Sequence, residues 1–166
     1  MGMTFPERVA AVSLGLIPGD QRSEVATSGL VEGYDSRSLA ALAGQSANAY
    51  DAWQSDRLWV AALDELGLGI PDRLDAAKSL VRAYARLVTV GEISPRTGAA
   101  NIVEVHRAVE HPGCDEGFVG ACIDAARIVG LHFSHDDCGF LDHVEHERID
   151  LEIVEECRRL ADGPAV

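Results

Sequence analysis

Residues 71–92, PDRLDAAKSLVRAYARLVTVGE, carry the clearest structural signal in the chain. Their apolar residues recur every three or four positions, the spacing that places side chains on one face of an α-helix. These residues are Leu74, Ala77, Leu80, Val81, Tyr84, Leu87 and Val88. Charged residues fill the positions between them, so the stretch predicts an amphipathic helix that packs one face against its neighbours.

Capping and turn residues on both sides of this stretch divide the chain into further segments of helical length. Ser94 followed by Pro95 marks a helix start, because serine caps a helix and proline fits its first turn. Glycine or Gly-Pro marks several helix ends. The expected helices cover approximately residues 6–16, 20–33, 35–44, 46–69, 71–92, 94–111, 115–133 and 142–163.

The composition agrees with a helical protein. Of the 166 residues, 47% are hydrophobic and only 5% are aromatic, so alanine, leucine and valine dominate the apolar set. Small and aliphatic side chains favour closely packed helices over a β-sandwich. We therefore expect residues 1–166 to form one all-α domain, a bundle of seven or eight helices joined by short turns.

The charge is strongly acidic and uneven. The chain has a formal net charge of −13, and residues 101–166 hold 15 acidic against 5 basic residues. Phosphate binding needs a basic surface, so this balance argues against DNA or RNA as a direct partner. The acidic C-terminal part is either a solvated surface or a face that meets a basic partner protein.

The N-terminal residues carry no recognisable targeting signal. The apolar stretch 9–17 is too short to span a bilayer, and no small-residue cleavage pattern follows it. We therefore expect a cytoplasmic protein that does not enter a membrane. In that compartment the four cysteines are more readily thiols or metal ligands than disulfides.

All six histidines and all four cysteines fall between residues 106 and 157. In a helical projection of residues 142–163, His143, His146 and Asp150 share one sector with the apolar residues of that helix. These apolar residues are Ile149, Ile153, Val154, Cys157, Leu160 and Ala161. His106 likewise lies on the apolar face of its own expected helix. Inward imidazoles beside a carboxylate are a common way for helical bundles to hold zinc or iron. The expected ligands are His106, His143, His146 and Asp150, with His132, His135 or Asp136 as completing groups.

Simpler interpretations of these residues remain open. A histidine on an apolar face is often a half-buried side chain that bonds a backbone carbonyl, and Cys122 and Cys157 project onto apolar faces as core residues do. The aromatic residues Tyr50, Trp53 and Trp59 either line a ligand cavity or anchor the core. In the helix expected over 46–69, Trp53, Val60 and Leu63 are assigned to one face.

Two classes of function are consistent with these patterns. The first is a binding or regulatory module, of the immunity or inhibitor kind, that docks a basic partner through its acidic C-terminal third. Its expected contact residues are Glu145, Glu147, Glu152, Glu155 and Glu156. The second is a metal-binding protein or small metal-dependent enzyme. The sequence contains no phosphate loop and no serine-hydrolase motif. An apolar helix face is also compatible with a homodimer.

Overall fold

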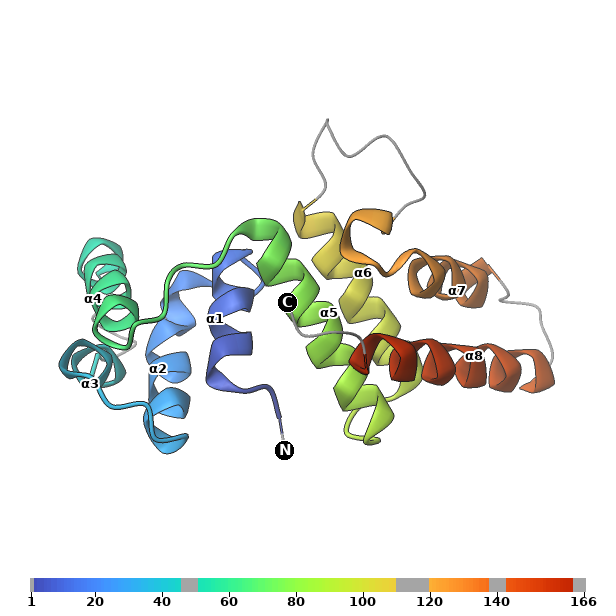
Figure 1. Ribbon diagram of the computed structural model, residues 1–166, viewed down its shortest axis with the longest axis horizontal. Helices are drawn as coiled ribbons and strands as arrows, with labels where there is room; N and C mark the ends of the chain where they lie inside the picture. Colours follow the sequence, from blue (N-terminus) through green and yellow to red (C-terminus); the bar gives the residue numbers. More distant parts are fainter. Residues whose placement is uncertain (1, 46–50, 110–119, 138–142, 163–166) are drawn as a thin grey trace. The chain divides into compact units, whose positions relative to one another are not determined.

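The computed structural model describes residues 2–45, 51–109, 120–137 and 143–162, without the side chains of residues 136, 137, 143 and 144. These ranges contain eight α-helices and no strand, which confirms the all-α prediction (Figure 1). The helices are α1 (Phe5–Ser13), α2 (Arg22–Val31), α3 (Arg37–Ala43), α4 (Ala52–Glu65), α5 (Arg73–Thr89), α6 (Pro95–Val109), α7 (Ala126–Asp137) and α8 (His143–Ala161). Two short 3₁₀ turns, η1 (Gly19–Gln21) and η3 (Ala121–Ile123), complete the described elements.

The capping signals set several helix starts as expected. Ser94 caps α6 by accepting a hydrogen bond from the amide of Thr97 at 3.1 Å, and Pro95 is the first helical residue. Ser36 caps α3 in the same way. The helix expected over residues 20–33 starts later than expected, because Asp20 lies within η1 and α2 begins after it, at Arg22.

The helix expected over 115–133 is interrupted in the structure. Gly120 and Asp124 both have positive φ, at 83° and 60°, so the backbone between them turns as η3 and cannot continue as an α-helix. Helix α7 starts only at Ala126 and runs on to Asp137, four residues beyond the expected end. His132 and His135 therefore both lie on helix α7.

The chain divides into two compact units, Met3–Ala76 and Ala77–Val166, the second of which also contains Met1–Gly2. In the first unit, the ring of Phe5 lies 4.8 Å from that of Tyr34 and 6.4 Å from that of Trp59. Leu39, Leu42 and Leu63 are buried in the same core. The expectation of one domain over residues 1–166 stays a prediction.

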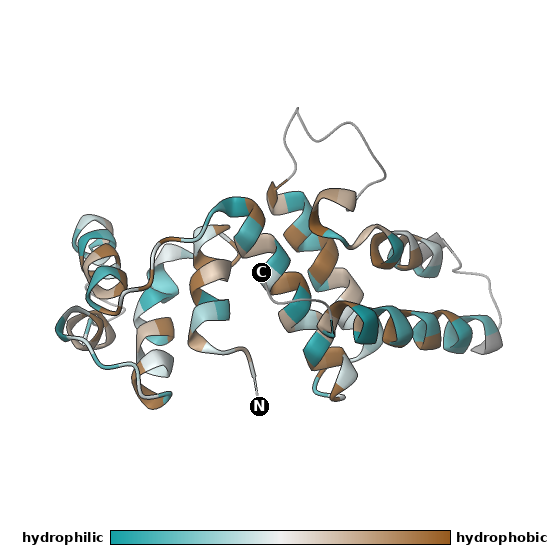
Figure 2. Cartoon of the chain, viewed as in Figure 1, coloured by the Kyte–Doolittle hydropathy of each residue, from teal (hydrophilic) through white to brown (hydrophobic). Residues whose placement is uncertain are grey.

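In the second unit the apolar faces of α5 to α8 are buried. Leu80, Ile102, Ile128 and Ile153, one from each helix, have no exposed surface. Figure 2 shows hydrophobic and hydrophilic residues distributed around α6 and α8, as amphipathic helices require. Helix α8 contacts both α6 and α7, so its buried face packs against two other helices of this unit.

None of the described helices combines the length and the apolar composition that are needed to cross a membrane.

A close approach between α5 and α6 gives a test of this packing. A Cβ atom on Gly98 would lie 2.1 Å from Cγ2 of Val88, a stiff and buried side chain, whereas one on Gly130 in α7 would meet nothing within 4 Å. We expect Gly98→Ala to lower the free energy of unfolding by about 1–3 kcal/mol through overpacking. Gly130→Ala should raise it by about 0.5–1 kcal/mol, the gain in helix propensity.

Urea unfolding followed by circular dichroism measures both variants. Equal stabilities for Gly98→Ala and Gly130→Ala would contradict the packing of α6 against α5.

Candidate functional site

The end of α7 and the start of α8 bring three of the expected metal ligands together. The side chain of His135 is 8% exposed, and its ring lies 4.7 Å from the ring of His146. Its Nε2 lies 3.8 Å from Oδ1 of Asp150. His146 and Asp150 are four residues apart on α8, so both lie on the flank of that helix which faces α7.

Two buried polar atoms in this group have no hydrogen-bond partner in the described part of the chain. They are Nδ1 of His135 and Oδ1 of Asp150. A buried polar group left unpaired costs about 1–3 kcal/mol, so such atoms are candidates to bind a water or an ion. Nδ1 of His106, a residue that is buried on α6 as expected, is in the same state.

The full ligand set of the metal hypothesis does not assemble in the part of the chain that the structure describes. Within that part, no group of three or more His, Cys, Asp or Glu side chains is arranged to hold a metal ion. His132 is half-buried, with its ring 5.6 Å from the ring of Phe133. The side chains of His143 and Asp136 lie outside the described residues.

The acidic residues of α8 differ in their surroundings. Glu145 and Glu152 both form ion pairs with Arg148, the latter at 3.0 Å. Glu147 and Glu155 are exposed to solvent. The acidic surface expected from the sequence is thus partly neutralised by arginine from the same helix, and Glu147 and Glu155 keep an exposed position.

Glu156, the fifth expected contact residue, is 4% exposed. It accepts hydrogen bonds from Nε and Nη2 of Arg159 at 2.8 and 2.6 Å, and Nη1 of Arg127 lies 3.6 Å away. Its carboxylate is therefore an internal charge with cationic partners. An exposed docking face cannot use it, and this part of the expectation is corrected.

Leu151 is a feature of α8 that the sequence reasoning missed. It is 71% exposed, and it lies four residues from Glu147 and four from Glu155. Spacings of four residues place all three on one outward face, which we call the α8 stripe: Glu147, Leu151 and Glu155. A helical projection contains this signal, because Leu151 falls outside the apolar sector of the helix.

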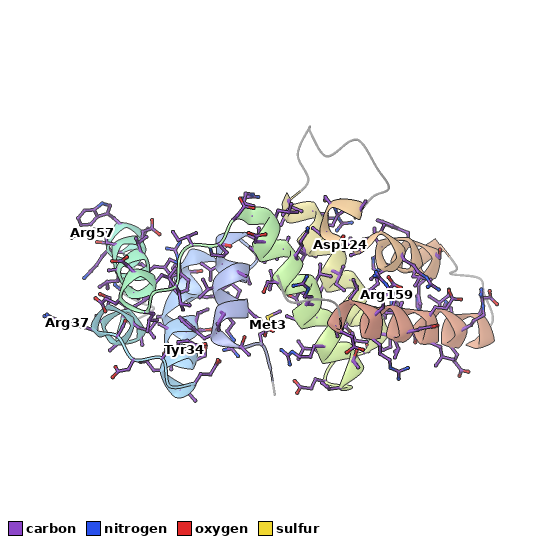
Figure 3. The ribbon with its side chains drawn as sticks, viewed as in Figure 1. Met3, Tyr34, Arg37, Arg57, Asp124 and Arg159 are labelled. Carbon is purple, nitrogen blue, oxygen red and sulfur yellow. The ribbon has the colours of Figure 1, made fainter. Side chains whose placement is uncertain are left out.

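The two tryptophans of α4 lie in different environments. Trp59 is 5% exposed and packs in the core of the first unit, whereas Trp53 is 67% exposed. The guanidinium of Arg57 lies over the Trp53 ring, 4.7 Å from its centroid (Figure 3). Tyr50 lies outside the described residues. Trp59 is thus a core anchor, and Trp53 and Trp59 do not face a common interior.

Cys157 is buried on α8, as its place in the apolar sector predicts. Burial raises the pKa of its thiol to about 12, and the neighbouring carboxylate of Glu156 acts in the same direction. At neutral pH the group is therefore a protonated, apolar side chain that is unsuited to nucleophilic catalysis.

No protein-family model matches this chain, and neither a curated protein sequence nor a solved structure shows significant similarity to it.

The raised pKa of Cys157 predicts slow modification. At pH 8 we expect iodoacetamide to label half-buried Cys122 before Cys157, because alkylation needs an accessible thiolate. Above pH 9 the unfolded chain loses the thiol proton while the folded chain keeps it, so the stability that this proton contributes is lost as pH rises from about 9 to about 12.

Peptide mass spectrometry of timed samples measures the labelling, with a urea-unfolded sample as the control in which both sites react. Labelling of Cys157 as fast as that of Cys122 in the folded protein would contradict its burial.

Proposed function

We propose that this protein is a binding module that docks a basic partner protein through the α8 stripe. The observation that supports the proposal is the exposure of Leu151 between Glu147 and Glu155. A lone exposed leucine is common on protein surfaces, but here an acidic residue flanks it one turn away on each side. The absence of a catalytic motif in the sequence favours a role in binding over one in catalysis.

The stripe has the composition of a small interface. An apolar side chain that moves from water into a partner's pocket contributes about 1.5–3 kcal/mol, so Leu151 serves as the anchor. The carboxylates of Glu147 and Glu155 border it as a charged rim. Such rims mainly steer association and choose the sign of the partner's charge.

The surrounding charges favour a basic partner. Helix α8 carries six acidic residues against three arginines. Because Arg148 is shared between Glu145 and Glu152, the helix keeps a surplus of negative charge next to the stripe. A partner surface with clustered lysine or arginine complements this surplus.

Site-specific crosslinking tests the proposal. A photoreactive amino acid at position 151 should crosslink a partner protein in the cells that make this chain, and the same amino acid at Val90 should not. Val90 is a matched control, because it is 59% exposed in the same compact unit. The captured protein should have a basic contact surface, and raising the salt concentration should reduce capture.

Charge variants give the second arm of this test. Glu147→Gln combined with Glu155→Gln should weaken partner binding about tenfold, since two rim charges are lost. Glu24→Gln combined with Asp64→Asn removes the same charge from the exposed surfaces of α2 and α4 and should leave binding unchanged. Equal loss in both double variants, or crosslinking at both positions, would contradict docking through the α8 stripe.

A metal-binding site at the α7–α8 junction is the second candidate, and the orphaned Nδ1 of His135 and Oδ1 of Asp150 favour it. On this hypothesis, protein incubated with zinc or iron and then desalted retains the metal. His135→Ala combined with His146→Ala should release it, whereas Ser134→Ala, an exposed change on the same helix, should not.

Metal content by mass spectrometry and helicity by circular dichroism measure this outcome. Metal retention that is the same in the double histidine variant would end the hypothesis.

A further inference from the structure

A pocket of about 530 Å³ lies within the unit Ala77–Val166. Residues from α5, η3, α7 and α8 line it, so elements far apart in the sequence meet there. Its volume falls within the range of about 300–1,000 Å³ that is typical of small-molecule sites. The pocket shares no residue with the α8 stripe, so a ligand bound in it and a partner docked on the stripe would occupy separate sites.

The pocket concentrates positive charge in an acidic chain. Four basic side chains line it, Lys78, Arg82, Arg127 and Arg159, and Lys78 is the one lysine in the sequence. Two carboxylates, those of Asp124 and Glu156, oppose them. The balance in the pocket is therefore two positive charges, whereas the whole chain carries −13.

Two of the four cations have an internal partner. Arg159 donates two hydrogen bonds to Oε1 of Glu156 and a third, at 3.4 Å, to the backbone carbonyl of Asp124 (Figure 3). Arg127 lies 3.6 Å from Glu156 and 3.7 Å from Glu152. The carboxylates of Glu156 and Glu152 together account for these two arginines.

The other two cations are held more loosely. Nζ of Lys78 lies 3.8 Å from Oδ2 of Asp124, which is beyond hydrogen-bond distance. Arg82 is half-buried and forms no hydrogen bond or ion pair with the described residues. The two are four residues apart on α5 and share a face. A half-buried guanidinium beside a second cation is unfavourable unless an anion joins them.

The remaining lining residues are mostly apolar, and Val81, Ile123 and Leu160 contribute from three different elements. Val81 and Ile123 are 1% exposed and Leu160 is 6% exposed, so they form a buried apolar wall of the pocket. The pocket therefore suits a ligand with one anionic group and one apolar part.

We propose that this pocket binds a small organic phosphate monoester. The phosphate group would lie between Lys78 and Arg82, and the apolar part of the ligand against Val81, Ile123 and Leu160. A phosphate monoester carries about −1.5 to −2 charge at pH 7, which matches the surplus of two positive charges. Arginine binds phosphate oxygens through its planar fork of N–H groups, and lysine supplies a point charge.

Calorimetric titration with three probes tests the inference. Phenyl phosphate combines both features, inorganic phosphate lacks the apolar part, and benzoate carries a single charge. We expect phenyl phosphate to bind at least about tenfold more tightly than either of the other two. Benzoate binding as tightly as phenyl phosphate, or no saturable binding of phenyl phosphate up to about 10 mM, would overturn the proposal.

Variants locate the binding. Arg82→Gln and the double variant Lys78→Gln/Arg82→Gln should weaken phenyl phosphate binding by about tenfold or more. Arg107→Gln is the matched control, because Arg107 is exposed on α6, pairs with Glu104 and does not line the pocket. It should change the affinity less than about twofold. Equal affinities in the Arg82 and Arg107 variants would overturn the assignment.

Folding and site location are checked separately. Arg82 bonds no described residue, so Arg82→Gln should keep the wild-type circular dichroism spectrum and Tm, and it decides the test alone if the double variant unfolds. In amide nuclear magnetic resonance spectra, phenyl phosphate should shift signals of residues 78–82, 121–127 and 156–160. Shifts confined to other residues would overturn the pocket as the site.

Discussion

The carboxylate of Glu156 is 4% exposed, and a charge at that depth is tolerated only when cations and hydrogen bonds surround it. Arg159 and Arg127 supply these partners from α8 and α7, so a single buried acid draws two guanidinium groups to one end of the α7–α8 pair. Because Arg127 also approaches Glu152, this network connects the two helices by charge next to their apolar contact. Removal of either guanidinium would leave this internal negative charge with a single cationic partner, so the two arginines together stabilise the carboxylate at the α7–α8 contact.

Helix α8 presents three different surfaces to its surroundings. Ile149, Ile153, Cys157 and Leu160 form the buried side, which is why the pKa of the Cys157 thiol is raised. His146 and Asp150 occupy the flank that meets His135, while Leu151 lies on the outward side. The period of 3.6 residues separates these roles along one helix, so neighbouring residues face a core, a polar junction and solvent.

Much of the fold was accessible from the sequence because local chemistry sets helix starts and buried faces. Ser94 with Pro95 predicted the start of α6, and the apolar sector of the last expected helix predicted the buried face of α8. The face assigned to α4 was wrong for Trp53 and Val60, since large apolar side chains at exposed positions carry no local mark that distinguishes them from core residues. The end of α7 was missed, because a backbone turn at Asp124 shifts the helix along the chain.

The site was less accessible than the fold, because its contacts join distant residues. The sequence grouped His146 with Asp150 through helical spacing, but the approach of His135 depends on how α7 packs against α8. Lys78 and Arg82 likewise line one pocket with Arg159 only after α5 and α8 have folded together.

At physiological salt, charges separated by more than about 8 Å are largely screened. The net charge of a chain therefore says little about the potential inside one pocket, so an acidic protein with a local surplus of cations is consistent with binding an anion there while α8 offers carboxylates to a basic partner.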